Sequence, residues 1–138
     1  MIVIPQRDIK DGSVISLRGD SGNYMSRMGP TGLELSKGSI DQYSKFKVVL
    51  IQIGGDKKLA LQGDNGKFMS RMGPTGLELS KDTIDQYSQF SYAIDNASGQ
   101  ISLRGDTGKW MSRMGETGLQ LSKDAIDRYS QFMLVLEG

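Results

Sequence analysis

A group of polar and aromatic residues recurs three times along the chain in an order that suits the binding of a polar ligand. In its first occurrence Arg27 is followed by Ser36-Lys37 and then by Asp41-Gln42-Tyr43. A carboxylate and an amide exchange hydrogen bonds with neighbouring hydroxyls, cationic groups donate further ones, and an aromatic face packs against C–H groups. These are the contacts that a sugar requires. The group therefore predicts a site for a polyhydroxylated ligand in each occurrence.

The composition excludes much of the chemistry that enzymes use. The chain has no cysteine and no histidine, which removes thiol nucleophiles, imidazole acid–base catalysis and the usual zinc ligands. Its 17 basic and 16 acidic residues give a formal charge of +1, which supplies no strong field for a polyanion. We therefore expect no catalysis, no cofactor, no bound metal and no nucleic-acid partner.

The N-terminal stretch from Met1 to Ile9 contains only a short apolar run before Pro5. No segment of the chain approaches the length of a signal core or of a bilayer span. We expect no membrane insertion, and a location in the cytoplasm or outside the cell after non-classical secretion.

The chain is a threefold internal repeat. The equivalent glycines Gly19, Gly63 and Gly105 recur at intervals of 44 and 42 residues, and the difference in length falls in the connectors. We expect a single domain over residues 1–138, with repeats at about 10–52, 53–95 and 96–138. Recent duplication alone would also make the copies alike, but the outer part of the last strand has diverged between them while the polar group has persisted. That difference favours a shared binding requirement.

Each repeat has the period-two pattern of β-strands in its first half. Ile15 and Leu17 alternate with polar neighbours, and Asp20-Ser21-Gly22 is a hairpin turn in which the aspartate is expected to accept backbone N–H bonds. The second strand is predicted over about Asn23 to Met28, and the turn Gly29-Pro30-Thr31-Gly32 ends it.

The second half of each repeat completes two hairpins. The return strand is predicted over Leu33 to Lys37, followed by a polar, irregular segment from Gly38 to Lys45 with room for one helical turn. The fourth strand is predicted over Phe46 to Ile51 and is apolar almost throughout, as in a more buried strand. The expected core residues are Leu17, Met25, Leu33, Leu35, Ile40, Phe46 and their counterparts in the other repeats.

Four strands in each of three repeats predict an all-β fold of twelve strands. Closure of six strands into a barrel, capped by three hairpins, removes the exposed edges that separate hairpins would leave. This arrangement is the β-trefoil. A propeller has at least four blades as a rule, and a β-solenoid has shorter and more regular rungs.

The string G-D-x-G-K-F/W-M-S, at Gly63 to Ser70 and Gly105 to Ser112, resembles the G-x-x-G-K-Y-L-S signature of the fascin-like and hisactophilin-like trefoils. The element Tyr-Ser-x-Phe, which ends at Phe46, Phe90 and Phe132, is similar to their W-E-x-F element. This resemblance implies a β-trefoil and, as an alternative function, actin binding or bundling. The absence of histidine and the near-neutral charge depart from the surfaces with which those trefoils bind filaments. A trefoil inhibitor is a further alternative, although no single variable loop stands out.

The architecture also resembles that of the β-trefoil lectins, which bind glycans in a pocket formed by the ends of the second and third strands and the polar segment that follows. This resemblance implies a carbohydrate-binding protein with up to three equivalent sites, whose partners are glycans or glycoconjugates. The third copy has Arg128 where the others have Gln42 and Gln86, so its affinity is expected to differ. For Arg27 and Asp41 a salt bridge that fixes the loop is an equally good interpretation. The candidate ligand-binding residues are Arg27, Ser36, Lys37, Asp41, Gln42, Tyr43, Arg71, Lys81, Asp85, Gln86, Tyr87, Arg113, Lys123, Asp127, Arg128 and Tyr129.

Overall fold

The computed structural model describes residues 9–95 and 97–137, and over these residues the chain forms twelve β-strands and three short 3₁₀ helices. The N-terminal stretch discussed above lies outside the described residues except for Ile9. The first repeat contains β1 (Val14–Arg18), β2 (Tyr24–Met28), β3 (Gly32–Lys37), η1 (Gln42–Ser44) and β4 (Phe46–Ile53). The second contains β5 (Asp56–Gln62), β6 (Phe68–Met72), β7 (Gly76–Lys81), η2 (Gln86–Ser88) and β8 (Phe90–Asp95). The third contains β9 (Gln100–Arg104), β10 (Trp110–Met114), β11 (Gly118–Lys123), η3 (Arg128–Ser130) and β12 (Phe132–Leu136).

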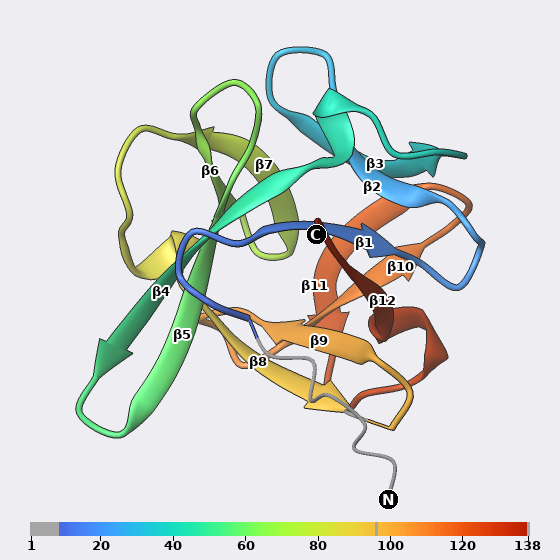
Figure 1. Cartoon of the computed structure of the whole chain (residues 1–138). Coiled ribbons are helices and arrows are strands. Elements are labelled where there is room, and N and C mark those ends of the chain that lie inside the picture. Colours follow the sequence, from blue (N-terminus) through green and yellow to red (C-terminus); the bar gives the residue numbers. More distant parts are fainter. Residues whose placement is uncertain (1–8, 96, 138) are drawn as a thin grey trace, which may run out of the picture.

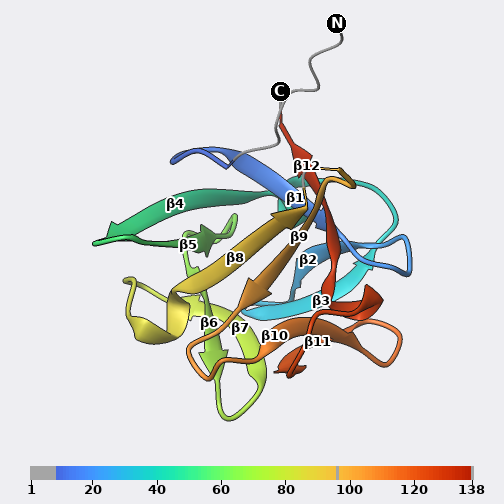
Figure 2. The same ribbon diagram turned by 90° about the horizontal axis from the view of Figure 1, so that it is seen from below.

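Six of these strands close into a barrel. Antiparallel pairing runs from β1 to β4, β5, β8, β9 and β12, and β12 pairs with β1 again. The remaining strands form the hairpins β2–β3, β6–β7 and β10–β11, which Figure 2 shows together at one end of the barrel. The β4–β5 hairpin extends beyond the body of the barrel (Figure 1). The prediction of a β-trefoil with twelve strands is confirmed.

The three hairpins are joined to one another by main-chain hydrogen bonds around the pseudo-threefold axis. The N–H of Leu35 donates to the carbonyl oxygen of Thr117 at 2.7 Å, and the two equivalent bonds of the other repeats measure 2.8 Å. Each bond therefore crosses from one repeat to another. Equivalent main-chain groups of all three repeats thus meet around the axis, and their hydrogen bonds hold the three hairpins in one fixed arrangement.

The core follows the strand alternation closely. Phe46, Phe90 and Phe132 are fully buried, as are Leu17, Met25 and their counterparts, because period-two alternation places one face of each strand inside the barrel. The prediction that Ile40 belongs to the core is wrong: its exposed fraction is 37%, and that of its counterpart Ile126 is 40%. Both precede a 3₁₀ helix and lie outside the strands, so no sheet alternation turns them inward.

Two glycines of each repeat are required for different reasons. Gly29 has a φ of +65°, a conformation that other residues rarely adopt, and it begins the turn between β2 and β3. Gly32 ends that turn, and a Cβ atom there would lie 2.6 Å from the carbonyl oxygen of Met28. The turn geometry therefore brings the two hairpin strands too close for any side chain at this position.

Among the described residues, no helix has both the length and the apolar character needed to cross a membrane.

Candidate functional site

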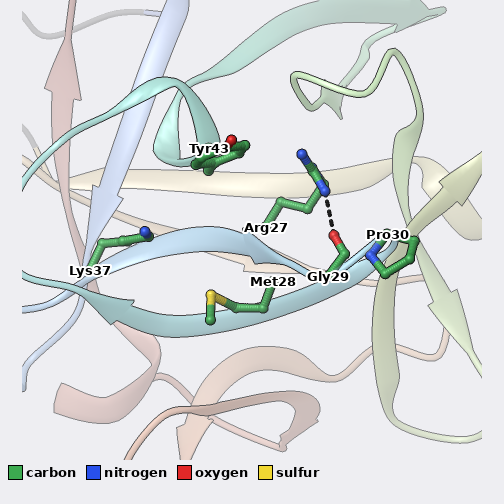
Figure 3. Close-up of a pocket in the computed structure, with 6 residues that line it drawn as sticks. All are labelled: Arg27, Met28, Gly29, Pro30, Lys37 and Tyr43. Atoms are coloured by element: carbon green, nitrogen blue, oxygen red, sulfur yellow. Dashed lines mark hydrogen bonds between the residues drawn. The ribbon is translucent and has the colours of Figure 1, made fainter.

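The first candidate site is an open pocket with a volume of about 510 Å³, lined by Arg27, Met28, Gly29, Pro30, Lys37 and Tyr43. Three elements supply it: the end of β2 with the turn after it, the end of β3, and η1. Figure 3 shows Tyr43 beside the Arg27 side chain, with Lys37 and Pro30 at opposite ends of the group. The structure therefore brings together three of the candidate residues, in the place that the strand ends predicted.

Arg27 contacts a residue of the next repeat. Its Nε donates to Oδ1 of Asp64 at 2.7 Å and its Nη2 donates to Oδ2 at 2.9 Å, while Nη1 donates to the carbonyl oxygen of Gly29. The interpretation that Arg27 forms a salt bridge with Asp41 is therefore wrong. Two parallel hydrogen bonds between a guanidinium and a carboxylate fix the plane of both groups, which sets the orientation of the arginine in the pocket wall.

The same pair recurs between the other repeats, and we refer to the three pairs Arg27–Asp64, Arg71–Asp106 and Arg113–Asp20 as the Arg–Asp clasps. Each arginine stands near the end of the second strand of its repeat, and each aspartate belongs to the first turn of another. The Nε to Oδ1 distances are 2.7, 2.7 and 2.6 Å. Because the third clasp returns to the first repeat, the clasps form a closed ring around the molecule.

The carboxylate of Asp41 supports the local backbone. Its Oδ1 accepts the N–H of Tyr43 at 2.9 Å, and the N–H of Asp41 in turn donates to Oγ of Ser44 at 2.8 Å, which is a reciprocal capping box at the start of η1. Its Oδ2 lies 3.3 Å from Nζ of Lys37. Asp85 and Asp127 make the equivalent contacts. Asp41 therefore fixes the backbone at Tyr43 and the side chain of Lys37, two residues that line the pocket.

Two cationic groups lie close to the ring of Tyr43. Cζ of Arg27 is 5.0 Å from the ring centroid, and Nζ of Lys37 is 5.6 Å from it. Both distances fall within the range of cation–π attraction, which adds to the ordering of the tyrosine. In the second repeat the distances are 4.9 and 5.5 Å, and in the third they are 5.1 and 5.4 Å. The three sites therefore share one geometry at this ring.

The remaining polar candidates occupy different places. Oγ of Ser36 lies 3.2 Å from the sulfur of Met28, at the edge of the pocket, whereas the side chain of Gln42 is exposed outside the set that lines it. Ser26 precedes Arg27 and persists in all repeats, but it is fully buried, so its persistence reflects packing. A polar residue that is repeated in all three copies can thus belong to the interior of the protein.

The clasps and the capping carboxylates affect protonation in the same direction. Hydrogen bonds from the arginines hold the pKa values of Asp20, Asp64 and Asp106 below the usual aspartate range, against the opposing effect of partial burial. At Asp41 desolvation tends to raise the pKa, but the Lys37 ammonium and the N–H groups of η1 outweigh it and leave the pKa lowered. All of these carboxylates are therefore ionised at neutral pH.

Sequence reasoning missed the aspartates of the clasps as parts of the site, and it also missed Met28, Gly29 and Pro30. The aspartates were assigned to their own turns, where main-chain N–H groups help to lower their pKa values, but the hydrogen bonds of each carboxylate come from the arginine of another repeat. The repetition of an aspartate one residue after Gly19, Gly63 and Gly105 was the available signal. Because a role in the turn already accounted for the repeated aspartate, no contact with another repeat was inferred from it.

The tripeptide Arg18-Gly19-Asp20 has the sequence found in integrin ligands, and both of its charged side chains form hydrogen bonds within this fold. Nε of Arg18 donates to the carbonyl oxygen of Gly22 at 3.0 Å, and Asp20 is held in its clasp by Arg113. Both charged groups therefore have a hydrogen-bond partner within the protein.

Comparison with known proteins agrees with the topology. No protein-family model and no curated protein matches the sequence. A solved structure described as "BEL beta-trefoil apo crystal form 3" is similar over 99% of this chain and 100% of that chain, with a TM-score of 0.75 and 13% sequence identity. At this identity the likeness concerns the fold alone, and together with the closed barrel and its three hairpins it shows that the chain is a β-trefoil.

Proposed function

We propose that the protein is a carbohydrate-binding protein with one binding site in each repeat and no catalytic activity. The observation that carries the proposal is the pocket at Tyr43, where an aromatic ring, a thioether and two cationic groups line one open hollow. A sugar presents an apolar C–H face beside a rim of hydroxyls, and this combination of groups is complementary to both.

The lining of the pocket retains hydrogen-bonding capacity after its internal bonds are counted. A guanidinium has five N–H donors, and Arg27 uses three of them in the bonds to Asp64 and Gly29. Lys37 has three donors and makes one ion pair, with Asp41. Within residues 9–95 and 97–137 the hydroxyl of Tyr43 forms no hydrogen bond, so it is available as well. A ligand hydroxyl would therefore meet several unused donors around one aromatic ring.

The internal order of the site reduces the entropy cost of binding. The clasp fixes Arg27, the capping box fixes the backbone at Tyr43, and the ion pair fixes Lys37. Side chains that are already held in one rotamer lose little freedom when a ligand binds. Threefold repetition adds avidity for a branched glycan, since linked sites can gain a factor of about 10² to 10⁴ over one site.

A glycan array with the intact chain tests the proposal. We expect binding to glycans with several accessible copies of one sugar, and a stepwise loss of signal when Tyr43→Ala, Tyr87→Ala and Tyr129→Ala are introduced singly and then together. Lys47→Ala is a matched surface control, because Lys47 is exposed on β4 and does not line the pocket. An array without any signal at millimolar sugar equivalents would refute carbohydrate binding. Equal signals for the wild type and the triple tyrosine variant would refute this choice of site.

A further inference from the structure

The third site differs from the other two at one position beside its aromatic ring. Arg128 stands where the first two repeats have Gln42 and Gln86. Cζ of Arg128 lies 4.7 Å from the centroid of the Tyr129 ring, nearer than either of the cations that all three sites share. The third ring therefore carries an additional cationic group that the other rings lack.

Arg128 also occupies the polar end of this tyrosine. Its Nη2 donates a hydrogen bond of 2.6 Å to the hydroxyl oxygen of Tyr129. In the described part of the chain the hydroxyls of Tyr43 and Tyr87 form no such bond. In the first two sites a sugar that approaches the ring meets only the two cations that all three sites share, and it finds the hydroxyl unbonded. In the third it would have to displace a guanidinium from the ring and from the hydroxyl together.

The third site has a different arrangement of charges from the other two. The first site pairs two cations with two carboxylates, through the Arg27–Asp64 clasp and the Lys37–Asp41 ion pair. The third has the same two pairs, and Arg128 adds a positive charge to them. The only other charge that distinguishes the lining of this repeat, Glu116 in place of Pro30, is exposed and forms no ion pair among the described residues. The formal charges of the lining therefore still cancel, but Arg128 adds its positive charge directly at the ring of Tyr129, whereas Glu116 stands in the turn between β10 and β11.

We propose that Arg128 gives the third site a specificity of its own: it disfavours the neutral sugar that the first two sites bind and selects a saccharide that carries a carboxylate or a sulfate. This inference rests on the proposed carbohydrate-binding function. A guanidinium offers parallel N–H donors to an oxyanion, and such charge-assisted bonds are stronger than the neutral bond to a tyrosine hydroxyl. An acidic saccharide can thus compensate for the lost Arg128–Tyr129 bond, and a neutral one cannot.

The methionines of the chain provide a separate reporter for each site. Met28, Met72 and Met114 occupy equivalent positions at the ends of β2, β6 and β10, with exposed fractions of 38, 39 and 39%. Met28 lines the first pocket, so its methyl group would sense a bound sugar. The fully buried Met25 and its counterparts give reference signals in the same spectrum. Carbon-13 labelling of the methionine methyl groups therefore allows the three sites to be titrated together by NMR.

The titration uses the methyl glycosides of galactose, glucose, mannose and N-acetylglucosamine as neutral probes. Galacturonic acid, glucuronic acid and galactose 6-sulfate serve as acidic probes and separate carboxylate from sulfate. We expect a neutral probe to shift the methyl signals of Met28 and Met72 with similar affinity, and that of Met114 at least about tenfold more weakly. An acidic probe is expected to bind at Met114 at least about tenfold more tightly than at the other two, and less so as salt is added.

Two reciprocal variants assign the effect to one residue. Arg128→Gln restores the residue of the first two repeats, so the fold is expected to tolerate it, and it should make Met114 respond to the neutral probe as Met28 does. Gln42→Arg should weaken the neutral response at Met28 by about the same factor and leave that at Met72 unchanged. Together the variants exchange the specificities of two sites in one molecule.

Each outcome decides between the two proposals. Equal neutral responses at Met28, Met72 and Met114 in the wild type would overturn the inference about Arg128 and leave carbohydrate binding intact. An acidic probe without preference for Met114 would overturn it in the same way. Silence of all three methyl signals with every probe, combined with a blank glycan array, would refute carbohydrate binding and the inference together.

Discussion

The packing of Leu35 against Gly19 explains why position 19 requires a glycine, and it allows the cost of a side chain there to be predicted. The φ angle of Gly19 lies outside the left-handed region, so its backbone alone does not require glycine. A Cβ atom there would lie 2.8 Å from Cδ1 and 3.3 Å from Cδ2 of Leu35, whose side chain is fully buried. The requirement for glycine therefore comes from one neighbouring leucine. A double-mutant cycle on the two residues measures that requirement.

The expected energies follow from the packing. Gly19→Ala forces the leucine to move in a filled core, which costs roughly 1–3 kcal/mol, less about 0.4–1 kcal/mol gained from the lower entropy of the unfolded chain. Leu35→Ala removes a fully buried side chain and should cost about 3 kcal/mol or more. In the double variant the new methyl group enters the space left by the leucine, so the steric cost of Gly19→Ala should vanish and only the entropy gain should remain. The entropy gain is the same in both backgrounds and cancels, so we expect a coupling energy equal to the steric cost, about 1–3 kcal/mol.

Urea unfolding of the four proteins, followed by circular dichroism, measures the cycle. The repeats supply a matched control: Leu79 is the equivalent leucine of the second repeat and faces Gly63 instead of Gly19. Gly19→Ala combined with Leu79→Ala should therefore be additive within about 0.5 kcal/mol. If Gly19→Ala costs the same in the wild type and in the Leu35→Ala background, the leucine is not the reason for the glycine.

The remaining predictions concern the clasps and the hairpin turns. Because the arginines lower the folded-state pKa of Asp20, Asp64 and Asp106, their stabilisation is present above the unfolded pKa of 3.8 and lost as the pH falls through the folded values. The triple Asp→Asn variant should thus be less stable at pH 7, with a shallower loss of stability below about pH 4 in urea unfolding; an acid limb as steep as that of the wild type would contradict this. Gly32→Ala should destabilise the protein by roughly 1–3 kcal/mol, since its Cβ would meet a main-chain carbonyl oxygen at 2.6 Å. Gly38→Ala, with no atom within 4 Å of its Cβ and no positive φ, should be neutral or stabilising by up to about 1 kcal/mol, and equal losses for the two variants would contradict the steric explanation.

The strands and the barrel were predictable from the sequence because they depend on local signals. Alternation at Ile15 and Leu17, repeated glycine turns and three equal copies leave few ways to bury the apolar faces without exposed edges. The fourth strand continues to Ile53, two residues beyond its prediction, because it pairs with β5 from Lys47 to Ile53. Ile40 was assigned to the core by residue type alone, since the irregular segment around it has no periodicity from which to infer a direction.

The clasps were not predictable by the same reasoning. Arg27 and its partner Asp64 are 37 residues apart, and within one repeat the nearest suitable carboxylate in the polar segment is Asp41. Only closure of the barrel places the first turn of one repeat beside the second strand of another. The position of Tyr43 near Lys37 was predictable, because Lys37 ends the third strand and Tyr43 lies in the short segment that follows it. The roles of the candidate residues in ligand binding remain predictions.

The ring of clasps determines how many repeats the molecule can contain. Every repeat has an arginine that reaches one neighbour and an aspartate that receives from the other, and Arg113 meets Asp20 across 93 residues of sequence. Each clasp is a heterologous interface, with an arginine on one repeat and an aspartate on the next. Such an interface forms a closed ring only when the rotation between neighbouring repeats adds up to a full turn, and here three repeats complete that turn. A chain with one repeat deleted would leave an arginine and an aspartate without counterparts at an open seam, and a fourth repeat would have no place between them. The same ion pairs that orient the pocket arginines thus limit the ways in which such a protein can grow or shrink by duplication.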